Sequence, residues 1–89
     1  MANEYYWRIK MAEIKFDIVE KLGALGEGSK GWQKELNLIS WNSRGAKADI
    51  RDWDEAHEKM GKGVTLNRKE LIALKKLLSE LDLDSMEIE

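Results

Sequence analysis

The sequence predicts an α+β domain in which a four-stranded antiparallel sheet is followed by one C-terminal helix. Several short runs alternate apolar with polar residues, which is the pattern of strands that are buried on one face. Segments containing glycine or asparagine separate these runs, as in the turns of antiparallel hairpins. The last third of the chain instead carries leucines at helical spacing behind a capping sequence. The order of the patterns is therefore β-β-β-β-α.

The first strand is expected to begin at Ile14. There Ile14, Phe16 and Ile18 alternate with charged residues, and the alternation continues less regularly to Leu25. Residues 26–31 (GEGSKG) then form a glycine-rich turn. This segment matches the G-x-G-x-x-G fingerprint of a dinucleotide-binding loop, which requires a strand before it and a helix after it. Because a strand pattern follows here, we interpret the segment as a hairpin turn.

Three further strands follow in order. The second strand covers residues 32–41 and both begins and ends with tryptophan. Residues 42–45 (NSRG) contain asparagine and glycine, which tolerate positive φ, and form the next turn. The third strand covers residues 46–53. A polar connection over residues 54–61 leads to a short fourth strand at residues 62–66.

The helix has the clearest signals. Asn67 is the expected N-cap, and Glu70 follows three residues later, as a capping box requires. An apolar stripe continues from there at helical spacing and consists of Leu71, Leu74, Leu78 and Leu81, widened by Ile72 and Leu77. The acidic tail opposes the negative end of the helix dipole, so the helix is expected to fray after Leu83.

A chain of 89 residues is expected to form one domain, at residues 13–83. An N-terminal extension of uncertain order precedes it at residues 1–12, and an acidic tail follows at residues 84–89. A domain this small buries little of its own surface, and without cysteine it has no disulfide to stabilise it. One sheet and one helix also leave apolar surface uncovered. We therefore expect a homodimer that is held through the leucine stripe.

No enzyme is expected. The chain has one histidine, His57, and no cysteine, so no metal or other cofactor is expected, and His57 is interpreted as a solvated or hydrogen-bonded loop residue. The carboxylates do not lie in apolar stretches that would raise a pKa for acid–base catalysis, so no small-molecule substrate is expected. Residues 1–10 lack the apolar core of a signal peptide, and no run is long enough to span a bilayer. The expected location is cytoplasmic, with no membrane partner.

Charge is unevenly distributed along the chain, whose net charge is −2. Residues 29–69 carry nine Lys/Arg against six Asp/Glu, a local +3, and the remaining residues carry six against eleven, a local −5. Segregation of this kind can leave one basic face on an acidic protein. In the basic part, tryptophans are interleaved with Lys34, Arg51 and Lys62. This combination is typical of surfaces that bind single-stranded nucleic acid by base stacking and phosphate neutralisation.

Three motifs, in this order, resemble the positive-cofactor-four family of transcription coactivators. They are residues 48–53 (ADIRDW), residues 59–66 (KMGKGVTL) and the capped leucine helix. The closest resemblance is to the short bacterial, YdbC-like branch of that family, which shares the patterns seen here at residues 32–37 (WQKELN) and 40–42 (SWN). The resemblance covers residues 14–83. It implies a curved sheet and a homodimer with packed helices that grips single-stranded DNA.

Carried over by position, the resemblance implies a nucleic-acid-binding surface with aromatic and basic parts. Trp41 and Trp53 take the places of stacking aromatics, and Arg51 takes that of an arginine in contact with a phosphate or a base. Asn37 shares the face of Trp41 by strand alternation, while Trp32 is left open between the rim of this surface and the core. The basic places on strand two and before strand four are those of Lys34, Lys59 and Lys62.

Two departures from the family pattern bear on the expected affinity. Where eukaryotic members have a Tyr-Trp pair and an extra basic residue, this chain has Asp52 before Trp53, and Met60 before Gly61. Together with the acidic balance, these residues imply weaker and more salt-sensitive binding.

The alternative function is a protein-interaction module that binds a peptide on the tryptophan-rich sheet. DNA or RNA as the partner, and transcription, repair or replication as the pathway, are left open.

Overall fold

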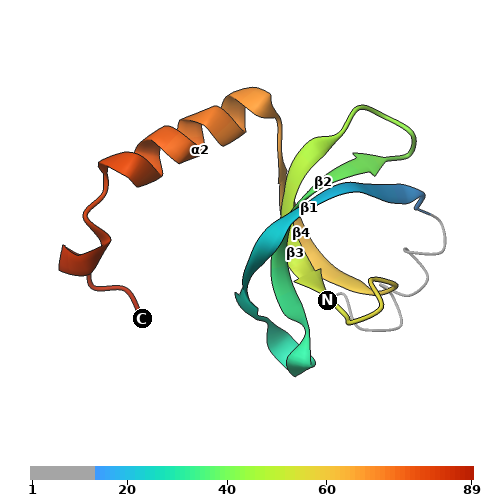
Figure 1. Cartoon of the computed structure of the whole chain (residues 1–89), viewed down its shortest axis with the longest axis horizontal. Helices are drawn as coiled ribbons and strands as arrows, with labels where there is room; N and C mark the ends of the chain where they lie inside the picture. The colour runs from blue at the N-terminus through green and yellow to red at the C-terminus, as the bar shows by residue number, and fades with distance from the viewer. Residues whose placement is uncertain (1–13) are drawn as a thin grey trace.

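The computed structural model describes residues 14–89, and the expectation for residues 1–12 lies outside this range. Four strands are followed by one long helix, as the sequence predicts (Figure 1). The strands are β1 (Phe16–Glu27), β2 (Gln33–Trp41), β3 (Lys47–Trp53) and β4 (Met60–Leu66). The helix is α2 (Arg68–Glu80), and short 3-10 turns lie at Ser29–Gly31 and Leu83–Ser85.

The four strands form one antiparallel sheet in the order β1-β2-β3-β4, so each strand pairs with its neighbours in sequence. The predicted fold class is therefore confirmed. The strand boundaries differ from the expected ones by one or two residues, because hairpin pairing decides where a strand ends and apolar alternation does not.

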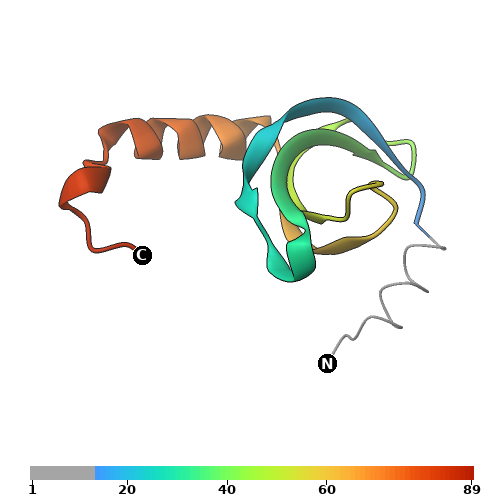
Figure 2. The same ribbon diagram turned by 60° about the horizontal axis from the view of Figure 1, so that its bottom comes forward.

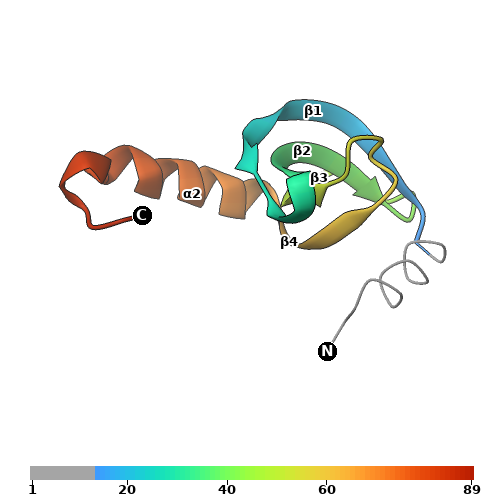
Figure 3. The same ribbon diagram turned by 90° about the horizontal axis from the view of Figure 1, so that it is seen from below.

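The sheet is bent into an arch, which Figures 2 and 3 show from two further directions. Along β1 the pairing with β2 shifts between Ile18 and Glu20, between Lys21 and Gly23, and between Ala24 and Gly26. At each shift β1 has one extra residue, and such bulges bend a strand and increase its twist. The bulges explain why apolar alternation along β1 becomes irregular after Ile18.

The core lies on the inner face of the arch. Ile39, Trp53 and Met60 are buried there, and three partly buried side chains pack against them, those of Phe16, Ile18 and Trp41. Strand alternation accounts for this set, because the direct pairs Phe16–Trp41 and Ile18–Ile39 place all four side chains on one face. The small core of the sheet is thus closed by the curvature of the sheet itself.

The outer face of the arch is also apolar but less covered. Leu36 pairs with Ile50, and Leu38 pairs with Ala48, on the face opposite the core. Of these four, only Ala48 is buried, whereas the other three are half-buried. Val64, which pairs with Ile50 from β4, is 50% exposed.

Helix α2 begins with the predicted capping box. The Asn67 side chain accepts a hydrogen bond from the Glu70 amide at 2.8 Å, and the Glu70 carboxylate accepts one from the Asn67 amide at 2.9 Å. The helix ends at Glu80, with Leu81 in an extended conformation, which is earlier than the expected fraying after Leu83. No basic residue lies in its last turn to offset the dipole.

The helix extends away from the sheet, as Figure 1 shows, and none of its residues is buried. Leu71 and Leu74, near the sheet, are half-buried. Farther along, Leu77 is 60% and Leu78 50% exposed. Within residues 14–89 no helix is long and apolar enough to cross a membrane.

The capping box predicts the effect of replacing Asn67. Asn67→Ala should lower the free energy of unfolding by about 1 kcal/mol, because the amide of Glu70 loses its acceptor. Glu70→Gln is the matched control, since an amide oxygen can still accept from the Asn67 amide. Urea denaturation followed by circular dichroism measures both changes. Equal unfolding midpoints for Asn67→Ala and the parent would contradict the assigned cap.

Candidate functional site on the inner face of the sheet

Polar side chains of β2 and β3 face each other on the inner side of the arch. Glu35 pairs with Arg51, and Asn37 pairs with Asp49. Glu35 is 9%, Asn37 1% and Asp49 0% exposed, so this cluster lies beneath the protein surface. Buried charges of this kind require partners, because each one loses its hydration. The hydrogen bonds of the cluster therefore determine what the site can do.

Arg51 is held by Asp49, which lies two residues earlier on the same strand and face. The Arg51 Nε atom donates to Asp49 Oδ1 at 2.6 Å, and Nη2 donates to Asp49 Oδ2 at 2.8 Å. The Nη1 atom reaches β4, where it donates to the Gly61 carbonyl at 3.4 Å and approaches Met60 Sδ at 3.6 Å. The Arg51 side chain is only 11% exposed. Its charge is thus neutralised inside the protein by a two-point contact.

Trp41 lies against this guanidinium. The Arg51 Cζ atom is 4.7 Å from the centre of the Trp41 ring, which is the distance of a cation–π contact. The Phe16 ring is 5.9 Å from the Trp41 ring and is tilted by 45°. Trp41 is half-buried, and its Nε1 atom is buried without a hydrogen-bond partner. Trp41 therefore combines a fixed position with a partly accessible ring.

Trp53 belongs to the core, which corrects the expectation of an accessible stacking ring. It is 1% exposed, with Phe16 at 5.3 Å and His57 at 5.7 Å between ring centres. Its position at the end of β3, beside charged neighbours, is the reason for the different expectation. The loop after β3 folds back over the inner face and covers the ring.

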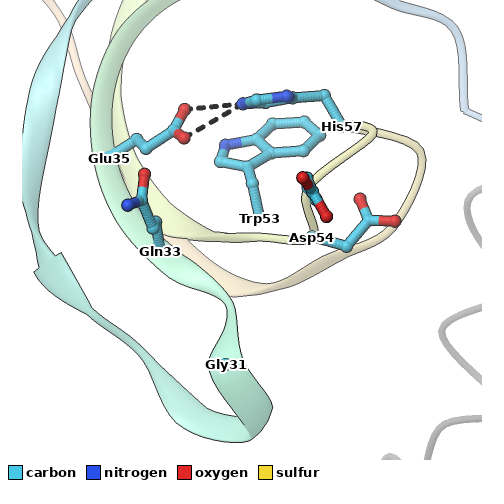
Figure 4. A pocket seen from close by; sticks show the side chains of 7 residues that line it. Gly31, Gln33, Glu35, Trp53, Asp54 and His57 are labelled. Atoms are coloured by element: carbon cyan, nitrogen blue, oxygen red, sulfur yellow. Dashed lines mark hydrogen bonds and ion pairs between the residues drawn. The ribbon is translucent and has the colours of Figure 1, made fainter.

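His57 connects this loop to β2. The loop turns at His57, where φ is 58°, and the Asp54 carboxylate accepts hydrogen bonds from the amides of Glu58 and Lys59 at 2.8 Å each. His57 Nε2 lies 2.9 and 3.0 Å from the two carboxylate oxygens of Glu35 (Figure 4). The interpretation of His57 as a hydrogen-bonded loop residue is confirmed.

A pocket of about 290 Å³ lies beside this contact. Figure 4 shows the side chains around it, which come from β2, from the end of β3 and from the following loop. Its charged lining is acidic apart from the histidine, and consists of Glu35, Asp54, Glu55 and His57. In the described part of the chain no group of three or more His, Cys, Asp or Glu residues is arranged to hold a metal ion.

The pKa of Glu35 is set by opposing effects. Burial raises the pKa of this carboxyl, whereas hydrogen bonds from Asn37 and His57 and the charges of His57 and Lys21 lower it. The lowering effects outweigh burial, so the pKa of Glu35 lies below its ordinary value. The Asn37 amide contributes through a 3.1 Å bond from Nδ2 to Glu35 Oε1. Asn37 is therefore a buried partner of Glu35, without an accessible amide.

The predicted basic residues do not gather around Arg51. Lys34 pairs with Asp52 and is exposed on the outer face of the arch, because consecutive residues of a strand lie on opposite faces and its neighbour Glu35 is on the inner face. Lys59 is exposed in the loop before β4, and Lys62 is exposed on β4. Trp32 is half-buried just before β2.

Two further lysines lie on the rim of the inner face and were not predicted from the sequence as site residues. Lys47 pairs with Ile39, and Lys21 pairs with Asn37, so both belong to the side that carries Trp41. Both are exposed. Alternation along β3 could have identified Lys47, since it lies four residues before Arg51. The bulges of β1 hide the corresponding signal for Lys21.

Comparisons with known proteins show the family to which this chain belongs. The family model described as Transcriptional Coactivator p15 (PC4) matches residues 28–77, which is more than half of the chain. An uncharacterized protein of Treponema pallidum (strain Nichols) is 44% identical over 72 residues, which cover 81% of this chain and 85% of that protein. The chain therefore belongs to the PC4 family of transcriptional coactivators. The bacterial relative agrees with the expected bacterial branch, and membership supports a role in nucleic-acid binding and transcription coactivation.

The lowered pKa of Glu35 predicts how acid affects stability. The ionised carboxylate stabilises the fold fully above the pKa of an unfolded glutamate, about 4.3, and this contribution is lost as the pH falls through the lower folded-state pKa. Glu35→Gln should therefore lower the free energy of unfolding at pH 7 by about 1.5–3 kcal/mol and flatten its decline below pH 4. Urea denaturation at pH 7 and pH 3 measures this. Glu58→Gln, at an exposed position in the loop, is the control, and parallel pH profiles for Glu35→Gln and the parent would exclude the assigned role.

The close packing around Gly63 predicts that a larger residue at this position destabilises the fold. A methyl group at Gly63 would meet the Cβ atom of Arg51 and the carbonyl oxygen of Ile50. Gly63→Ala should therefore reduce the free energy of unfolding by about 1–3 kcal/mol, as overpacking does. Gly61→Ala is the matched control on the same strand, because its methyl group would lie at an ordinary 3.7 Å from Asp52 Cβ. The urea midpoint is the measurement, and equal midpoints of the two variants would count against this packing.

Proposed function

We propose that this protein binds single-stranded DNA without sequence preference, as a homodimer, in transcription regulation or DNA maintenance. The observation that carries the proposal is membership in a transcriptional coactivator family, with a match that extends from the turn before β2 into α2. The proposal involves no catalysis and no cofactor. Its physical basis is base stacking on aromatic side chains combined with neutralisation of phosphates by lysines.

Trp41 is the stacking residue of this proposal. It is partly accessible and is already in contact with both Arg51 and Phe16, so little freedom is lost when a base stacks on it. Trp32, half-buried at the entrance of β2, provides a second aromatic contact at the rim. Trp53 supports the site from the core and does not stack.

Phosphates are contacted by lysines around the inner face. The exposed lysines on this rim and in the adjoining loop and strand are Lys21, Lys47, Lys59 and Lys62. Lysine is a compact charge on a flexible stem, which suits contacts that do not depend on base sequence. Lys34, on the outer face, adds to long-range attraction of the strand. The same mechanism would accept single-stranded RNA.

The homodimer forms through the apolar stripe of α2. Leu78 of this stripe is 50% exposed, and Leu81, which lies just beyond the end of α2, is 44% exposed. Their exposure in a single chain leaves an apolar surface that water disfavours, and a second copy would cover it. Dimerisation would also bring two arches together in one dimer, so that one strand of DNA could contact both arches.

A protein-interaction module is the second candidate, and one observation favours it. The inner face contains two buried carboxylates, those of Glu35 and Asp49, and Asp49 neutralises the nearest cation, Arg51. Such a face attracts phosphates less than a purely basic one would. Salt-insensitive binding of a peptide, without measurable binding of oligo-dT, would favour this candidate.

The first prediction of the proposal concerns stacking. Trp41→Ala should weaken binding to oligo-dT by about 1–3 kcal/mol, without a change in the dependence of log K on log salt. Lys47→Gln should instead flatten that slope by about 0.7, the value for one phosphate contact on a single strand. Fluorescence anisotropy over a salt series measures both. A folded Trp41→Ala variant that binds as tightly as the parent, or equal binding of a duplex, would refute the proposal.

The second prediction concerns assembly. Leu78→Asp should convert the dimer into a folded monomer, because a charge at this position opposes helix packing while its exposure in the single chain spares the fold. Ser79→Asp adds the same charge beside the stripe and should leave the dimer intact. Light scattering at micromolar concentration gives the mass of each variant. A monomeric parent protein would disprove dimerisation.

A further inference from the structure

Three side chains form a continuous chain of contacts on the inner face of the arch. Asp49 and Arg51 come from β3, and Trp41 comes from the end of β2. The carboxylate of Asp49 holds the Nε and Nη2 atoms of Arg51 at 2.6 and 2.8 Å. The Cζ atom of the same guanidinium lies 4.7 Å from the centre of the Trp41 ring. Asp49 therefore reaches Trp41 through Arg51.

The burial of these groups makes the arrangement rigid. Asp49 is fully buried, and the Arg51 side chain is 11% exposed, so neither charge can exchange its partner for water at low cost. A carboxylate and a guanidinium joined by two parallel hydrogen bonds also fix the plane of the guanidinium. Its third anchor is the Gly61 carbonyl on β4, and Gly63 leaves room for the Arg51 side chain.

We infer that Asp49 is a positioning residue for base stacking, because it holds the guanidinium of Arg51 over the ring of Trp41 before any DNA strand binds. This inference rests on the proposed binding of single-stranded DNA. A cation over the face of an aromatic ring is attracted by the ring and therefore favours the ring orientation in which the two are in contact. The partly exposed ring of Trp41 is then ready for a base without first losing side-chain freedom.

The same contacts indicate that Arg51 does not act as a phosphate-binding residue. Its charge is matched by Asp49, and three of its nitrogen atoms already donate to groups of the protein. A phosphate would meet a guanidinium whose charge is already matched and whose side chain is only 11% exposed. Arg51 therefore adds affinity through Trp41, and its removal leaves the number of released counterions unchanged.

The test removes both charges together, because removing one alone would leave a buried charge that could unfold the protein. The variant Asp49→Asn, Arg51→Gln keeps a polar side chain at each of the two positions. We expect it to bind oligo-dT about 2- to 30-fold more weakly, which corresponds to a lost cation–π contact, with an unchanged salt slope. Lys47→Gln, which removes an exposed charge from the same strand, is the control for a flattened slope.

A double-mutant cycle separates positioning from a general effect on the fold. When Trp41 is replaced by alanine first, the change at Asp49 and Arg51 should have no further effect on affinity. An equal loss in both backgrounds would mean a purely structural role. A slope that flattens by about 0.7 would mean that Arg51 contacts a phosphate. Either result would overturn the inference.

A measurement without DNA keeps this inference separate from the proposed function. In the free protein, the Nε1–H signal of Trp41 in an NMR spectrum, assigned with Trp41→Phe, should shift in the paired variant while that of Trp32 stays in place. An unshifted Trp41 signal would overturn the positioning role. If that signal shifts but the parent protein fails to bind oligo-dT, the proposed function fails and the contact of Asp49, Arg51 and Trp41 stands.

Discussion

The ion pair between Arg51 and Asp49 is the interaction on which the inner face of this small sheet depends. A fully buried carboxylate without a partner would destabilise the fold strongly, and Arg51 provides that partner from the same strand. The same guanidinium contacts Trp41 on β2 and the Gly61 carbonyl on β4. One side chain thus links three strands, and the absence of a side chain at Gly63 leaves the space for it. The shape and the charge of the candidate site both follow from this arrangement.

Curvature allows so few residues to close a core. The bulges of β1 bend the sheet until the Phe16 ring contacts both Trp41 and Trp53, which belong to different strands. The inner face is then filled by side chains of the sheet itself and by the loop that carries His57. The outer face and α2 receive no such cover, and their apolar side chains remain partly exposed. In the proposed homodimer, a second copy supplies the cover for α2 that the single chain lacks.

The elements that depend on local sequence could be predicted, and those that depend on long-range geometry could not. Alternation located β2 and β3, and the capping box of Asn67 located the start of α2. The prediction for Trp53 was wrong because a tryptophan at the end of a strand has the same local sequence whether or not a later loop covers it. The count of charges grouped Lys34 with Arg51, although the two residues lie on opposite faces of the sheet. Composition alone does not show on which face of a sheet a residue lies. Strand alternation places Arg51 and Asp49 on the same face, so their contact could have been predicted. The burial of this ion pair could not, because it results from the curvature of the sheet.

The most direct test of this account is an NMR measurement of the Arg51 side chain in the free protein. If the guanidinium is locked between Asp49 and Trp41, its Nε–H proton should exchange slowly with water and be displaced by the ring current of Trp41. Its signal should be well separated from that of Arg44, which is exposed, and Trp41→Ala, which removes the ring current and keeps both charges of the ion pair, should move it toward that signal. A rapidly exchanging Arg51 signal that coincides with the one from Arg44 would contradict the account, because it would describe an arginine that is free in solvent.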